Sequence, residues 1–165
     1  PNYIQQLDME SNGKSVDLDG HPLDYPAAPI VFGGVGTIAQ HTFFQFLHQG
    51  HEIVPCDFIA CKKPVYSYGE HHDKLISNVL GQMRALMEGR KDEDEPHRNF
   101  EGNRPSSVIW LESLTPFTLG LLIAFYEHKI FAQGAMWNIN SFDQFGVELG
   151  KELAKNALQL MRSGE

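Results

Sequence analysis

Cysteine is scarce in this chain, with only Cys56 and Cys61 among 165 residues. Their spacing matches neither a C-x-x-C redox pair nor a zinc knuckle, so we expect two unpaired thiols in a cytoplasmic protein. Long apolar runs are also missing, because the most apolar stretch, 119–125, is followed at once by Tyr, Glu, His and Lys. A spanning helix requires about 18 consecutive apolar residues, so we expect no membrane span.

Basic residues are few, because the chain has 13 of them against 21 acidic residues, which gives a net charge of −8. Nucleic acid and anionic membrane surfaces attract basic patches, so this balance disfavours both as partners. A Gly-rich phosphate loop between a strand and a helix is missing too, and the nearest candidate, 33–37, is weak. For a phosphorylated ligand, the principal phosphate anchor is therefore expected outside this chain.

The eight histidines form no recognisable metal motif. His71 and His72 are adjacent, and adjacent residues on a helix point about 100° apart, unlike the i, i+4 pair of a metalloprotease. We therefore expect no metal and no other cofactor.

The chain does contain an alternation of helical and strand-like segments. The apolar periodicity and turn signals predict helices at 3–10, 37–48, 71–89 and from 115 onward, and strands at 29–33, 52–59 and 107–111. Residues 14–29 are expected to be irregular, and the charged run 90–98 to be a solvated loop. Helices that alternate with short, apolar, β-branched strands predict an α/β fold with a mostly parallel sheet flanked by helices.

Two sequence patterns predict capping boxes at helix starts. Thr37 and Gln40 would open one helix, and Ser141 and Gln144 would open the last helix, after Gly134 ends the one before it. The last helix carries an apolar stripe at i, i+4 steps, made of Phe145, Leu149, Leu153, Ala157 and Met161. Such a stripe is suited to burial, and Lys151 lies off it.

The segment 134–151 resembles the C-terminal signature of the phosphoglucose isomerase (glucose-6-phosphate isomerase) family. Further blocks resemble that family in its order, at 8–14, 36–41, 54–59, 101–105 and 126–131. The resemblance covers nearly all of the chain but only the C-terminal part of the enzyme, because family members carry a further sugar-phosphate domain upstream. It implies that residues 1–165 form a sugar-isomerase-type (SIS) domain, a three-layer sandwich, of a longer two-domain enzyme.

This resemblance also implies an activity, the interconversion of glucose 6-phosphate and fructose 6-phosphate in glycolysis and gluconeogenesis. The reaction passes through ring opening and an enediol(ate), needs no metal, and is carried out by a cytoplasmic homodimer that binds a sugar phosphate. Without the upstream domain, the isolated chain is expected to be inactive. The alternative is a non-catalytic domain of the same fold that binds sugar phosphates or regulates in response to them.

Three residues match the catalytic positions of the family. Glu10 matches the base that moves a proton between C1 and C2, and a Glu at a helix end beside the turn 11–13 can project into a cleft. His41 matches a histidine that takes part in ring opening and reaches the active site of the neighbouring subunit. It is expected in the first turn of its helix, where the helix dipole disfavours the protonated imidazole. Lys151 matches the ring-opening lysine.

Two glutamines match substrate-binding positions. Gln6 lies one helical turn before Glu10, on the same face. Gln144 matches a ligand of the substrate phosphate, a role that it could combine with its capping box by using the amide oxygen for the cap and the nitrogen for phosphate. The loop before His41 departs from the family, because an acidic residue and an asparagine are lost between residues 33 and 39.

Overall fold

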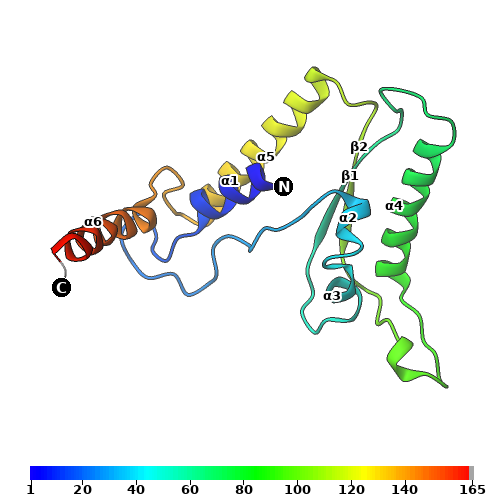
Figure 1. Cartoon of the computed structure of the whole chain (residues 1–165), viewed down its shortest axis with the longest axis horizontal. Helices are drawn as coiled ribbons and strands as arrows, with labels where there is room; N and C mark the ends of the chain where they lie inside the picture. Colours follow the sequence, from blue (N-terminus) through cyan, green and yellow to red (C-terminus); the bar gives the residue numbers. More distant parts are fainter. Residues whose placement is uncertain (164–165) are drawn as a thin grey trace. The chain divides into compact units, whose positions relative to one another are not determined.

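The structure, a computed structural model, describes residues 1–163 and divides into two compact units (Figure 1). Of the described residues, 1–32 and 124–163 form unit 1, and residues 33–123 form unit 2. The predicted α/β class, with a parallel sheet flanked by helices, is confirmed. Across the described residues, none of the helices combines the length and the apolar character needed to cross a membrane.

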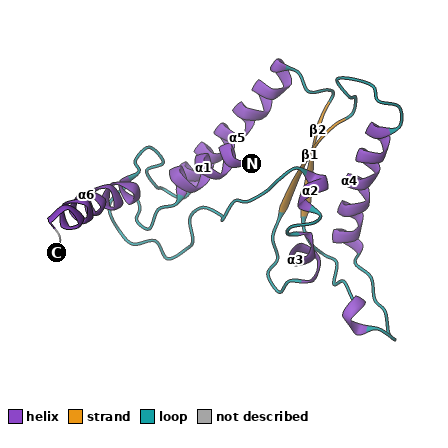
Figure 2. Ribbon diagram, in the orientation of Figure 1, coloured by secondary structure: helices purple, strands orange, loops and turns teal. Residues whose placement is uncertain are grey.

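Unit 2 is built on two parallel strands, β1 (Cys56–Cys61) and β2 (Ser106–Leu111) (Figure 2). They pair in register from Cys56 opposite Ser106 to Cys61 opposite Leu111. Parallel neighbours require a long crossover, which here contains α4 (His71–Glu88). The structure thus confirms the predicted helix at 71–89 and strand at 107–111, whereas the strand predicted at 52–59 begins later, at Cys56.

The core of unit 2 lies where three helices meet the sheet. It consists of buried side chains from α2 (Gly36–Ala39), α3 (Phe44–Gln49) and α4, namely Ala39, Phe44, Leu47 and Leu86. The Phe44 ring meets Phe58 of β1 edge-on, with centroids 6.4 Å apart. This apolar burial holds the helical layer on one face of the two strands.

The strand predicted at 29–33 is wrong. These residues are irregular, and Ile30 is 81% exposed. An apolar β-branched run forms a strand only when a neighbouring strand accepts its hydrogen bonds. In the described chain the sheet consists of β1 and β2 alone, so residues 29–33 have no neighbouring strand to pair with.

The single helix predicted at 37–48 is also wrong. The structure has α2, a turn at 40–43, and then α3, which ends at Gln49, one residue past the predicted end. Val35 is the N-cap residue of α2, and no side chain caps the first turn of this helix. The capping box predicted from Thr37 and Gln40 therefore does not form. Two adjacent aromatics at the turn, Phe43 and Phe44, stack with ring centroids 5.9 Å apart. The burial of Phe44 in the core outweighs the local capping pattern.

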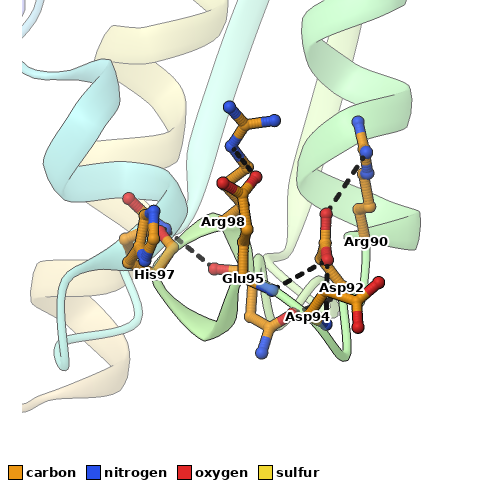
Figure 3. Close-up of polar contacts among 8 residues, drawn as sticks. Arg90, Asp92, Asp94, Glu95, His97 and Arg98 are labelled. Atoms are coloured by element: carbon orange, nitrogen blue, oxygen red, sulfur yellow. Dashed lines mark hydrogen bonds and ion pairs between the residues drawn. The ribbon is translucent and has the colours of Figure 1, made fainter.

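The charged run 90–98 is an exposed loop, as predicted, but it is held by specific contacts (Figure 3). The Asp92 carboxylate accepts hydrogen bonds from the backbone N–H groups of Asp94 and Glu95 at 3.2 and 3.0 Å. Arg98 pairs with Glu95 at 2.7 Å across the 3₁₀ turn η1 (Pro96–Arg98). The loop is therefore exposed to solvent and is also ordered by hydrogen bonds and an ion pair among its own residues.

The block 101–105 has a structural role in unit 2. Gly102 has φ +68°, and a Cβ there would lie 2.7 Å from the backbone carbonyl of Glu88, so the chain passes too close to α4 for a side chain. Arg104 is buried and donates to the carbonyls of Glu52 and Gly50 at 2.9 and 2.6 Å. These contacts join the end of α4 and the chain before β1 to the start of β2.

Unit 1 contains α1 (Asn2–Asn12) beside the C-terminal half of α5 (Pro116–Met136). The buried residues of α5 fall four apart, at Tyr126, Ile130 and Gly134, and form one face. The buried residues of α1, Asp8 and Asn12, have the same spacing. The predicted start of α5 at Pro116 is confirmed, whereas α1 continues two residues past its predicted end at Glu10 and stops before Gly13.

The last part of the chain differs from its prediction in three ways. First, α5 continues past Gly134 to Met136, and Gly134 instead allows Ser141 to approach the helix. Second, the helix predicted from Ser141 begins later, as the 3₁₀ turn η2 (Phe145–Val147) and then α6 (Glu148–Ser163), without a side-chain cap at η2. Third, the apolar stripe exists, but none of the α6 residues is buried in the described chain.

We predict that Gly102→Ala lowers the free energy of unfolding by about 1–3 kcal/mol, because the new Cβ meets backbone in a left-handed conformation. The matched control is Gly120→Ala, a helical glycine with open space around it, which should stabilise by about 0.5–1 kcal/mol. Urea titrations of both variants measure the difference. Equal effects of the two substitutions would contradict this account of the block 101–105.

Candidate active site

Unit 1 contains a cleft of about 750 Å³, lined on one side by α1 and residues 13–17 and on the other by residues of the segment 140–147. Three of the predicted site residues line it, Gln6 and Glu10 from α1 and Gln144 from the facing segment. The structure therefore brings together residues that are more than 130 positions apart in the sequence.

Glu10 stands in the last turn of α1 and is half-buried. Gln6, one turn earlier, donates its Nε2 to Glu10 Oε2 at 3.1 Å, so the predicted same-face geometry is present. Gly13 ends the helix, with its N–H bonded to the Met9 carbonyl at 3.1 Å. The last turn of α1 thus carries a carboxylate that is hydrogen-bonded to an amide and lines the cleft.

A buried polar network fixes this end of α1. Asn12 is fully buried; its Nδ2 donates to the Ile130 carbonyl of α5 at 3.0 Å, and its Oδ1 accepts from Ser141 Oγ at 2.7 Å. Asp8, 1% exposed, lies near Asn12 Nδ2 at 3.5 Å. Burial raises the pKa of the Asp8 carboxyl, against the opposing effects of the Lys129 charge and the Asn12 amide.

Lys14 and Asp143 also line the cleft, and our sequence reasoning missed both. The Lys14 ammonium donates to the backbone carbonyls of Glu10 at 2.9 Å and Asp143 at 2.7 Å, and lies 3.4 Å from the Asp143 carboxylate. Both residues lie inside sequence blocks that resemble the family, 8–14 and 134–151, and only that position could have indicated a place at the site. Their contact joins the two walls of the cleft.

Gln144 does not form the capping box predicted for its side chain. Its backbone forms the N-cap of η2, but its side chain makes no capping hydrogen bond there. Ser141, the other half of the predicted box, uses its hydroxyl for Asn12 instead. The Gln144 amide lies at the cleft and does not turn back onto a first helical turn.

The other two predicted catalytic residues do not line this cleft. His41 belongs to unit 2 and its side chain is exposed. Its backbone N–H donates to the Ile38 carbonyl at 3.0 Å. It follows the short helix α2, and the prediction that it sits in a first helical turn is wrong. Lys151 lies on α6 and is exposed.

One group within residues 1–163 gathers three side chains of metal-ligating type, namely Asp17, Asp19 and His21. The Asp17 carboxylate already accepts the backbone N–H groups of Asp19 and His21, at 2.9 and 2.8 Å. These bonds lower the pKa of the Asp17 carboxyl, that from the His21 N–H most strongly. The cluster is therefore explained as a turn stabilised by its own hydrogen bonds.

Comparison with known proteins supports the resemblance found in the sequence. The family model for phosphoglucose isomerase matches residues 1–165. The chain is 53% identical to a glucose-6-phosphate isomerase of Polaromonas naphthalenivorans, over the whole chain and 32% of that relative. It is 55% identical to that of Deinococcus radiodurans, over 94% of the chain and 30% of the relative. The chain thus spans about a third of the length of these relatives.

A solved structure agrees with these sequence matches. The crystal structure of a glucose-6-phosphate isomerase from Chlamydia trachomatis matches 98% of this chain and 32% of its own chain, with a TM-score of 0.89 and 45% identity. The predicted family is therefore confirmed, while the roles of the individual site residues stay predictions.

The buried network generates a prediction about pH. The pKa of Asp8 is raised in the folded state, so folding favours the neutral carboxyl. The contribution of this carboxyl to the free energy of unfolding is full below its pKa in the unfolded chain, about 3.9, and is lost as pH rises through its pKa in the folded protein. We expect Asp8→Asn, which cannot ionise, to gain stability relative to the wild type as pH rises across that window. Urea titrations of both proteins from about pH 4 to pH 7 measure this difference.

Asp17→Asn is the matched control of opposite sign. The pKa of Asp17 is lowered, so its contribution is present above the unfolded value and is lost as pH falls through the folded one. This variant should therefore lose stability relative to the wild type as pH rises. The same pH trend for both variants would contradict the assignment of Asp8 as a carboxyl that burial disfavours in its charged form.

Proposed function

The chain belongs to the phosphoglucose isomerase family, and on that premise we propose that it carries the catalytic base of an aldose–ketose isomerase. The proposed substrates are glucose 6-phosphate and fructose 6-phosphate. The observation that carries the proposal is the cleft in which Glu10, bonded to Gln6, faces the segment that bears Gln144.

The proposed chemistry is a proton transfer between two neighbouring carbons of the open-chain sugar. The Glu10 carboxylate removes the proton from C2 of the aldose, the aldehyde oxygen takes the negative charge, and a cis-enediolate results. Return of a proton from the Glu10 carboxyl to C1, with transfer of the hydroxyl proton from O2 to O1, gives the ketose. The hydrogen bond from Gln6 fixes the carboxylate that performs both transfers.

Ring opening must precede this proton transfer, and we assign it to His41 and Lys151. Both match the ring-opening positions of the family, and both side chains are exposed in the described chain. The imidazole moves a proton between the ring oxygen and the O1 hydroxyl, and the ammonium stabilises the negative charge that develops there. We propose a homodimer in which His41 of one copy serves the cleft of the other.

Phosphate binding requires more than this chain offers. Gln144 supplies one neutral donor at the cleft, and the Lys14 ammonium is already bonded to protein acceptors. A dianion is held by several donors and positive charges, so we infer that its main ligands belong to a separate sugar-phosphate domain of a longer cytoplasmic enzyme. The chain alone would then turn over little sugar.

A second candidate function is a domain that binds sugar phosphates without catalysis. Electrostatics disfavours it, because Glu10 places a carboxylate in the cleft that would receive a dianion. Such a charge weakens the binding of an anion and is useful only for proton transfer. The pairing of Glu10 with Gln6, which orients the carboxylate, favours the enzyme.

We predict that Glu10→Gln, made in the full-length protein, lowers kcat by about 10²–10⁴-fold, because an amide cannot carry the proton between C1 and C2. KM should stay the same or fall, since the amide keeps the size of the carboxylate and removes a charge that repels the phosphate. A coupled assay that consumes glucose 6-phosphate as it forms measures both constants. The control is Glu93→Gln on the exposed loop, which should leave activity intact. Activity of Glu10→Gln equal to that of the control would refute the assignment.

We also predict that two inactive variants restore activity when their subunits exchange. In a hybrid of Glu10→Gln and His41→Ala subunits, one cleft carries both substitutions and the other carries neither. An equal mixture should regain about a quarter of the wild-type activity, because half of the dimers are hybrids with one intact cleft. Exchange is verified by native mass spectrometry. No recovery in verified hybrids would show that His41 serves the cleft of its own subunit.

A further inference from the structure

Lys14 lies in the wall of the cleft, yet its charge is committed to the protein. Its side chain is only 14% exposed, and its Nζ lies within reach of three acceptors: the carbonyls of Glu10 and Asp143, at 2.9 and 2.7 Å, and the Asp143 carboxylate, at 3.4 Å. An ammonium has three N–H donors, and three acceptors surround this one. The donors needed to hold a substrate phosphate are therefore occupied.

The acceptors come from the two opposite walls of the cleft. One is the backbone of Glu10, at the end of α1; the other two belong to Asp143, the residue immediately before Gln144. A single ammonium thus connects the backbone of the base to the backbone beside the phosphate-binding glutamine. Because hydrogen bonds to a charged donor are stronger than neutral ones, this connection restrains the width of the cleft.

We propose that Lys14 is a positioning residue for the isomerisation, one that sets the spacing between Glu10 and Gln144 without touching the substrate. The inference rests on the proposed function. In an open-chain hexose phosphate, the reacting carbons and the phosphate lie at opposite ends. Phosphate binding therefore places C1 and C2 over the base only if the two ends of the cleft are held at a fixed spacing.

The test separates the two ends of the cleft by using two competitive inhibitors of the full-length protein. Inorganic phosphate engages the phosphate end alone. An aldonate phosphate carries a phosphate at one end and a carboxylate that mimics the enediolate at the other. The inhibition constants of both, with kcat and KM for fructose 6-phosphate, are measured for the wild type, Lys14→Met and the matched control Lys74→Met. Lys74 is an exposed lysine paired with Glu70 on α4.

For Lys14→Met we expect kcat to fall about 10- to 100-fold, since a misplacement of about 1 Å has an effect of that order. The inhibition constant of the aldonate phosphate should rise about tenfold, because the two ends of the cleft are no longer held at the spacing that fits both ends of the inhibitor. The constant for inorganic phosphate should stay unchanged, and Lys74→Met should resemble the wild type throughout.

Three results would overturn the inference. A weaker affinity for inorganic phosphate would make Lys14 a phosphate ligand. Unchanged kinetic constants would remove any role for it, and lower activity with both inhibition constants unchanged would reduce it to a contribution to stability. If Lys14→Met does not fold, Lys14→Arg, which keeps the charge but not the three-acceptor geometry, must show the same divergence between the inhibitors. A wild-type protein without isomerase activity would refute the proposed function, a separate outcome from these three.

Discussion

The cleft of unit 1 depends on two polar contacts that join the end of α1 to the segment after α5. Asn12 accepts a hydrogen bond from Ser141 in a fully buried position, and Lys14, two residues further along the chain, donates to the Asp143 carbonyl. A buried amide that loses its partner costs about 1–3 kcal/mol, so the contact between Asn12 and Ser141 holds this end of α1 firmly in place. Gly134 permits this arrangement, because any side chain there would collide with Ser141.

Those parts of the fold that local patterns determine could be predicted from the sequence. The helix α4, the strand β2 and, to within two residues, the ends of α1 and α3 follow from apolar periodicity and from turn residues. The errors share one physical cause, since tertiary contacts outweighed local signals. Phe44 is buried where an uninterrupted helix was expected, and Ser141 bonds Asn12 rather than its own helix. Periodicity also gave the α6 stripe without indicating what would cover it.

The candidate site was predicted in part. Gln6 and Glu10 share a helical face because they lie four residues apart, and the structure shows their side chains bonded. That Gln144 would face them could come only from the family resemblance, since no local rule relates residues so far apart. The contact of Lys14 with Asp143 escaped for the same reason, and because a lysine beside a helix end is usually solvated.

The proposed mechanism requires that Glu10 lie over the reacting carbons of a sugar whose phosphate reaches Gln144. The most direct measurement is a crystal structure of the full-length protein with an aldonate phosphate bound. The proposed mechanism predicts the Glu10 carboxylate within about 3.5 Å of the atoms that replace C1 and C2, with the Gln144 amide donating to the phosphate. An inhibitor bound in the cleft in the reverse orientation, or outside it, would contradict this mechanism.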